Sequence, residues 1–266
     1  MYALDFEYDR MKLSDYGMMI CSFDKGGGLE TVSSGADLTF NTVKTSGSDV
    51  SRFYGGKYEE SYSMTFQICK NVCLEDRILS PIEISALQRW LCRKDGFHRF
   101  KVFQDGYEGI HWNASFSSKQ VVFGGQIIGL ELTLTTDSPY AYGEEQKVTL
   151  SNGTHSLYDL NDEVGYIYPT ITVTNTTTGT FELINITSRE PTTYTTIELD
   201  NLDTVTLSGK NKTIVSANGY DYSGGKFNFI FPRLSNTFDD RENLFVIQGV
   251  ECEVTFTYCP KIKVGL

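Results

Sequence analysis

The sequence predicts a mainly β protein that carries one α-helix. Short runs in which apolar and polar residues alternate recur along most of the 266 residues, as in Val250–Tyr258. Glycine, tyrosine and phenylalanine are abundant, and this composition favours strands and turns. A single segment has the spacing of an amphipathic helix. We expect a first domain of strands that carries this helix on a sheet, followed by a second domain that is an antiparallel β-sandwich.

The helix is predicted over about 81–95. Ser80 stands at its N-cap, and Glu83 stands where a capping box needs an acidic side chain. Arg93 and Lys94 would lie in the last turn, where positive charge complements the helix dipole. An apolar stripe at helical spacing consists of Ile84, Leu87, Trp90 and Leu91. Because the helix has no second helix to pack on, it must lie on a sheet.

The strongest hairpin signal spans 119–136. Two strand-like runs, QVVF and QIIGLELTLTT, flank Gly124-Gly125, a dipeptide that tight primed turns accept. Further along, KFNFIFP is expected to place Phe227, Phe229 and Phe231 on one face of a strand.

A domain boundary is predicted after the second of these strand-like runs. Asp137-Ser138-Pro139 interrupts it, and a polar segment with Gly143 follows. We therefore expect domains at 1–143 and 144–266.

Composition excludes several classes of protein. The formal net charge of −11 argues against nucleic-acid binding, which needs clustered lysine and arginine. The sequence shows no signal peptide and no apolar run long enough for a membrane span. The dispersed cysteines are expected to be reduced, although disulfides stay open, because pairing cannot be read from a sequence. They are Cys21, Cys69, Cys73, Cys92, Cys252 and Cys259.

The segment 42–57 is polar and glycine-rich, with Phe53 and Tyr54 near its end. It is interpreted either as a solvent-exposed loop or as an extended arm that becomes ordered on a neighbouring subunit.

Residues that could carry chemistry are too scattered to form a recognisable site. The candidates considered are His98, His111 and His155, the possible zinc set Cys69, Cys73 and Cys92, the glycine run Gly26–Gly28, and the acidic pairs at 59–60, 144–145 and 239–240. None has the spacing that its chemistry requires, so no catalytic, cofactor-binding or metal-binding residue is predicted.

Six tyrosines near predicted turns of the second half leave three roles open. They could pack in the fold, seal a protein interface or stack on sugars. They are Tyr158, Tyr166, Tyr168, Tyr194, Tyr220 and Tyr222.

The order of these segments resembles the distal tail protein of long, non-contractile-tailed bacteriophages. The resemblance runs through YEESYSMTFQICK (58–70), the SPIEISALQRWL helix, FHRFKVFQ (97–104), GGQIIGLELTLTTDSPYAY (124–142) and the ending FPRL…GVECEVTFTY (231–258). Its most specific parts are the pattern Ser85, Leu87, Trp90 and Leu91, and the TTDSPYAY run.

The resemblance implies a structural virion protein of the phage tail, without catalysis or cofactor. The first domain would be a β-sandwich carrying the helix and would form a hexameric ring around a channel. The second domain would be a galectin-like β-sandwich. The ring would join the tail tube protein to the tail-tip protein, and in some phages it anchors receptor-binding proteins. The alternatives considered are a carbohydrate-binding module using the second domain, and an enzyme.

Overall fold

The computed structural model describes residues 3–23, 35–58, 60–71, 73 and 77–265. The chain divides into two units, Met1–Gly143 with Ile262–Leu266, and Glu144–Lys261. The sequence predicted that the end of the chain belongs to the second domain, 144–266. Here Ile262 and Val264 pack against the hydrophobic core of the first unit, which explains why the chain returns to it.

The first unit is built on a seven-stranded antiparallel sheet, with the order β2-β1-β7-β8-β9-β6-β3. Its strands are β1 (Phe6–Tyr8), β2 (Met11–Lys12), β3 (Met18–Cys21), β6 (Ser63–Lys70), β7 (His98–Val102), β8 (Trp112–Phe123) and β9 (Gln126–Thr136). A 3-10 helix, η1 (Leu13–Tyr16), follows β2, and β10 (Ala141–Tyr142) pairs with β22 (Lys261–Ile262).

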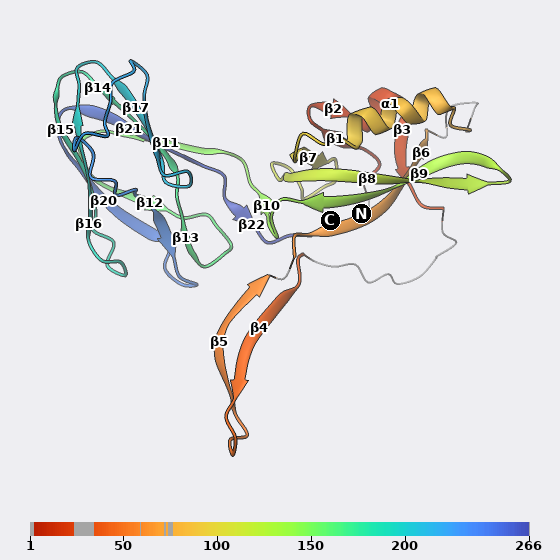
Figure 1. The fold of residues 1–266 in the computed structure, drawn as a ribbon, viewed down its shortest axis with the longest axis horizontal. Helices are drawn as coiled ribbons and strands as arrows, with labels where there is room; N and C mark the ends of the chain where they lie inside the picture. Colours follow the sequence, from red (N-terminus) through yellow and green to blue (C-terminus); the bar gives the residue numbers. More distant parts are fainter. Residues whose placement is uncertain (1–2, 24–34, 59, 72, 74–76, 266) are drawn as a thin grey trace. The chain divides into compact units, whose positions relative to one another are not determined.

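Helix α1 (Pro81–Leu91) covers one face of this sheet (Figure 1). Its predicted start is confirmed: the Ser80 hydroxyl accepts a hydrogen bond from the Glu83 amide at 3.3 Å, and the Glu83 carboxylate accepts one from the Ser80 amide at 2.7 Å. The buried Trp90 stacks on Phe6 and donates its indole N–H to the Tyr8 carbonyl at 3.0 Å. The four residues of the predicted stripe are all buried.

The predicted end of the helix is wrong. Cys92 leaves the helical conformation, with φ −95° and ψ 64°, so Arg93 and Lys94 lie beyond the last turn. The guanidinium of Arg93 instead pairs with the Asp9 carboxylate at 2.8 Å. A helix ending at Leu91 leaves a short turn that leads into β7.

The β8–β9 hairpin is confirmed at the predicted residues. Both turn glycines adopt positive φ, 58° at Gly124 and 80° at Gly125, a conformation that side chains disfavour. Leu130, Leu132 and Leu134 are buried beneath α1, as their alternation predicts.

The segment expected as a loop or arm folds into a hairpin of its own. Among the described residues, strands β4 (Leu38–Lys44) and β5 (Ser51–Tyr58) pair only with each other and form a separate two-stranded sheet (orange in Figure 1). We call residues 38–58 the arm. Thirteen of its fifteen strand residues are exposed.

The second unit consists of two packed antiparallel sheets. The first has the order β11-β21-β14-β17-β18 and the second β12-β20-β15-β16. The bounds of the first are β11 (Gln146–Leu150), β14 (Thr170–Asn175), β17 (Thr204–Ser208), β18 (Thr213–Ser216) and β21 (Cys252–Tyr258). Those of the second are β12 (Gly153–Tyr158), β15 (Gly179–Asn185), β16 (Thr193–Leu199) and β20 (Glu242–Gly249). A further pair joins β13 (Gly165–Ile167) to β19 (Leu234–Asn236).

Alternate residues of these sheets meet in one core. Phe245 of β20 contacts Phe256 of β21 with ring centroids 5.4 Å apart. Val173, Phe181 and Ile197 are fully buried beside them. The mainly β fold with one α-helix is therefore confirmed.

The prediction for KFNFIFP is wrong. Phe227 is buried, but Phe229 is 53% exposed and has φ 56°, which breaks the alternation of a strand. The segment still follows the edge of β16, because Asn228 donates its backbone N–H to the Thr196 carbonyl at 3.2 Å.

Among the described residues, no helix is long and apolar enough to cross a membrane.

Candidate interaction surfaces

The three histidines belong to three different segments of the chain. His98 is in β7, His111 directly precedes β8 and His155 is in β12. His111 is buried, and this burial, with the positive charges of Arg99 and Lys101, lowers its pKa to about 4. Such a residue stays neutral near pH 7 and packs rather than titrates.

The cysteines considered for zinc are not brought together. Cys69 is in β6, Cys73 is in the loop that follows and Cys92 caps α1. No group of three or more histidine, cysteine or acidic side chains in the described part of the chain could hold a metal ion. Gly26–Gly28 and Glu59 lie outside the described residues.

The arm combines large apolar side chains with high exposure. Phe40 is 58% exposed, Phe53 64% and Tyr54 65%. The rings of Phe40 and Phe53 contact each other at 5.9 Å between centroids. A Cβ added to Gly56 would lie 3.4–3.5 Å from Leu38 and Phe40, so the glycine lies beside these two side chains. A hairpin without a core of its own is marginally stable in water, so this surface is suited to burial against another chain.

The sheet face opposite α1 is rich in hydroxyl groups. Its central strands β6, β9 and β8 align Ser63 with Thr135 and Ser115, and Thr65 with Thr133 and Ser117. The hydroxyls of Thr65 and Thr133 are 3.1 Å apart, within hydrogen-bonding distance. This face is half-buried or exposed and largely uncharged, which suits contact with a protein neighbour or water.

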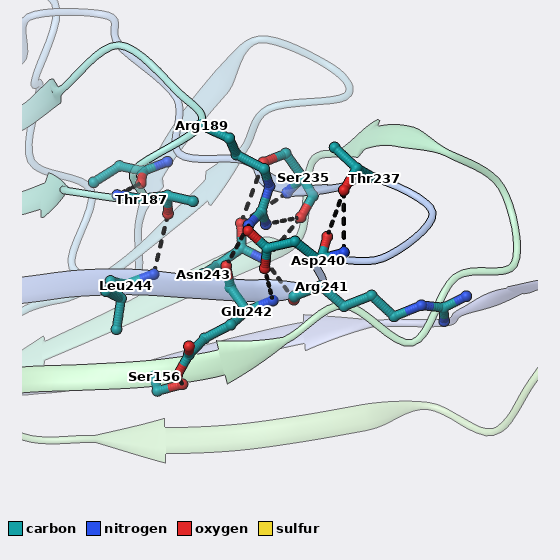
Figure 2. Close-up of polar contacts among 11 residues, drawn as sticks. Ser156, Thr187, Arg189, Ser235, Thr237, Asp240, Arg241, Glu242, Asn243 and Leu244 are labelled. Carbon is teal, nitrogen blue, oxygen red and sulfur yellow. Dashed lines mark hydrogen bonds and ion pairs between the residues drawn. The ribbon is translucent and has the colours of Figure 1, made fainter.

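In the second unit, a polar cluster centred on Arg189 joins three segments of chain (Figure 2). Its guanidinium donates to the Glu242 carbonyl at 2.7 Å and to the Ser235 carbonyl, and it pairs with the Asp240 carboxylate at 2.7 Å. The side-chain amide of the fully buried Asn243 accepts a hydrogen bond from the Ser235 backbone N–H and donates one to the Ser235 carbonyl, both at 2.9 Å. The cluster therefore fixes β20 to β19 and to the loop after β15. Asp240, which belongs to one of the acidic pairs considered as possible sites, is therefore held in an ion pair with Arg189.

A second buried polar centre surrounds Asp203, which has no exposed surface. Its carboxylate accepts hydrogen bonds from the Ser216 hydroxyl at 2.6 Å, the Tyr222 hydroxyl at 2.8 Å and the Thr204 amide at 2.8 Å. Burial alone would raise the pKa of Asp203, but these hydrogen bonds outweigh it and lower the pKa below its usual value. This centre ties the loop after β18 to β17.

The six tyrosines do not gather on one surface. Tyr222 is buried, whereas Tyr158, Tyr194 and Tyr220 are exposed on separate segments. Tyr166 and Tyr168 contact each other edge to face at 5.6 Å, and Arg233 lies over the Tyr166 ring at 4.8 Å.

Both halves of the chain match models of phage tail proteins. Residues 1–138 match the family described as phage tail protein N-terminal domain, and residues 140–258 match the phage tail C-terminal domain. A comparison with curated proteins found no match.

Among solved structures, the fold is similar to that of the SPP1 Dit (gp 19.1) protein, with a TM-score of 0.67. The likeness covers 96% of this chain and 98% of that one at 12% identity. That protein is described as a paradigm of the hub adsorption apparatus in phages that infect Gram-positive bacteria. The resemblance seen in the sequence is thus confirmed.

Proposed function

The chain belongs to this family of phage tail proteins and is a component of the virion tail, and we propose that six copies form a ring at its distal end. The ring would join the tail tube protein to the tail-tip proteins. The observation that carries the proposal is the likeness to a hub protein along nearly the whole chain. The role is structural, without catalysis or cofactor. Nothing in the comparisons favours the carbohydrate-binding alternative.

The arm supports ring formation. A closed ring uses heterologous contacts, in which one surface of each copy meets a different surface of the next. An exposed apolar hairpin such as 38–58 supplies one such surface, since Phe40, Phe53 and Tyr54 gain stability when they leave water. The hydroxyl-rich face of the first unit offers a second surface of low charge.

The acidic charge of the chain fits a ring around a passage for DNA. With a formal net charge of −11 per copy, such a ring repels the phosphate backbone and does not retain it. A strongly basic channel wall would contradict this part of the proposal.

The direct test is electron cryomicroscopy of the tail tip in the intact particle. We expect six copies of the chain, in one ring, in contact with the last ring of the tail tube. A different copy number, or a position elsewhere along the tail, would refute the proposal.

A further inference from the structure

The outer face of the β12-β20-β15-β16 sheet carries apolar side chains where a solvent-exposed sheet carries polar ones. Ile184 of β15 lies opposite both Val246 of β20 and Tyr194 of β16. Beside them, the Ile186 amide donates to the Leu244 carbonyl at 2.9 Å. We call these five residues the apolar strip.

Alternation along the strands shows that the apolar strip points away from the core. Phe245 and Ile247 of β20 and Leu183 of β15 are buried between the two sheets, so their neighbours Leu244, Val246 and Ile184 face outward. At the rim of the strip, Tyr194 is 52% exposed. Ile186 is 39% exposed, and Ile184, Leu244 and Val246 are half-buried. A contiguous apolar patch on the outer face of a sheet favours contact with another molecule.

Carboxylates flank the apolar strip on both sides. Glu242 lies on one side, and Glu182 and Glu198 lie on the other. The strands β12, β15, β16 and β20 are all fully described and contain no lysine or arginine. If two copies of the chain met through this face about a two-fold axis, the carboxylates of one copy would face those of the other. Their repulsion would oppose association.

The other sheet of the same unit provides the contrast. Its outer face has a row of threonines across four neighbouring strands, Thr149, Thr255, Thr172 and Thr206. The Thr149 and Thr255 hydroxyls are 2.9 Å apart. This face is well suited to water. Val215 of β18, which lies opposite Thr206 and is 59% exposed, is an isolated apolar residue at the edge of this row. The contiguous apolar strip lies on the other sheet.

We propose that the apolar strip is a docking surface for a different protein of the particle, one whose apolar contact surface is edged by lysine or arginine. The apolar centre would supply affinity, and the flanking carboxylates would select the partner and its orientation. The Arg189 cluster holds β20 in place and so presents a rigid surface. The proposal uses only the chain's place in the virion tail and does not depend on a six-membered ring.

Site-specific photocrosslinking in the assembled particle tests it. Val246 is replaced by benzoylphenylalanine, and Thr172 on the threonine face is replaced in a matched control. After irradiation of purified particles, we expect position 246 to crosslink to another tail protein, at a segment flanked by lysine or arginine. We expect no such product from position 172. A crosslink to a second copy of this chain, to a segment without basic residues, to nothing, or equally from both positions would overturn the proposal.

A pair of charged variants gives an independent measurement. Val246→Glu and Thr172→Glu each place a carboxylate at a half-buried position of a central strand, so the two purified chains should lose a similar amount of melting temperature. Only Val246→Glu should lower the number of infectious particles about tenfold or more, because it places a carboxylate in the apolar contact. Thr172→Glu should leave the number of infectious particles unchanged. If Val246→Glu leaves infectivity intact, or lowers it no more than Thr172→Glu does, Val246 is not part of a docking surface.

Discussion

At the scale of single residues, close backbone approach disfavours any side chain at position 129, which is Gly129. A Cβ at this position would lie 2.4 Å from the Ile68 carbonyl oxygen and 2.7 Å from the Phe23 ring. The carbonyl belongs to the neighbouring strand and cannot move without breaking the sheet. We expect Gly129→Ala to reduce the free energy of unfolding by about 1–3 kcal/mol. Urea denaturation measures this, with Gly56→Ala as the control, where the added Cβ meets ordinary contacts. Equal stability of the two variants would contradict the close approach.

Asp203 is the second residue whose replacement should be costly. Its carboxylate accepts hydrogen bonds from Ser216, Tyr222 and Thr204 in a site without exposed surface. Asp203→Asn replaces one acceptor oxygen with an amide donor and leaves a buried donor unpaired, at a cost of about 1–3 kcal/mol.

The exposed Asp239→Asn serves as the control for Asp203→Asn and should change unfolding by less than about 0.5 kcal/mol. Thermal and urea unfolding of the wild-type chain and the two variants measure the difference in the free energy of unfolding. If Asp203→Asn is as stable as the control, the carboxylate does not tie the loop after β18 to β17.

Neither residue could be predicted from the sequence. Gly129 stands inside a strand-like run and looks like any other glycine, because the close approach involves Phe23 and Ile68 from other segments. Asp203 meets Ser216 and Tyr222 only after β17 and β18 have paired. Local patterns carry no information on contacts of this kind.

At the scale of elements, the start of α1 gives a pH-dependent prediction. The Lys70 ammonium at 2.9 Å and the Ser80 amide lower the pKa of Glu83 to about 2. A folded-state pKa below the unfolded value stabilises the fold above the unfolded pKa, near 4.3, and this stability is lost as the pH falls toward 2. Because Glu83 is partly exposed, solvent screens the ion pair, and we expect the capping contribution to be about 1 kcal/mol.

Comparison with Glu83→Gln isolates this contribution. The wild-type chain should be more stable than the variant at pH 6, and the difference should shrink as the pH falls from about 5 to about 2. Chemical denaturation across this range measures it. A difference that is constant with pH would show that the carboxylate does not stabilise the helix start.

The elements also show where sequence patterns succeed. Ser80 and Glu83 are three residues apart, so a capping box is a local signal, and the helix starts where it predicts. Gly124-Gly125 is equally local and gives the predicted turn. The predictions of the helix end and of the KFNFIFP strand were wrong because tertiary contacts decide both structures. Arg93, for example, pairs with Asp9, which is far away in the sequence.

At the scale of the whole molecule, the arm was visible in the sequence but its form was not. The segment 42–57 stood out as polar and long, yet Leu38 and Phe40 before it belong to the same hairpin. The apolar strip had a sequence signal as well. The continuous run Leu244, Phe245, Val246, Ile247 departs from alternation and indicates a strand buried on both faces. Which molecule covers the outer face is a property of the assembly, and a single chain does not encode it in local patterns.

The arm provides the final prediction, that assembly and folding can be separated. In the single chain, Phe40 and Phe53 contact each other but lie largely in water, so the double variant Phe40→Ser, Phe53→Ser should leave the melting temperature unchanged. In a ring, each buried phenylalanine contributes about 1.5–3 kcal/mol per interface, so its loss weakens each contact by about tenfold or more. Mass photometry should show hexamers for the wild-type chain and monomers for the variant at the same concentration. Phe238→Ser, which alters a side chain that is 85% exposed in the second unit, is the matched control and should still form hexamers. Hexamers of the double variant would remove the arm from the ring interface, and a lower melting temperature would place Phe40 and Phe53 in the fold of the single chain.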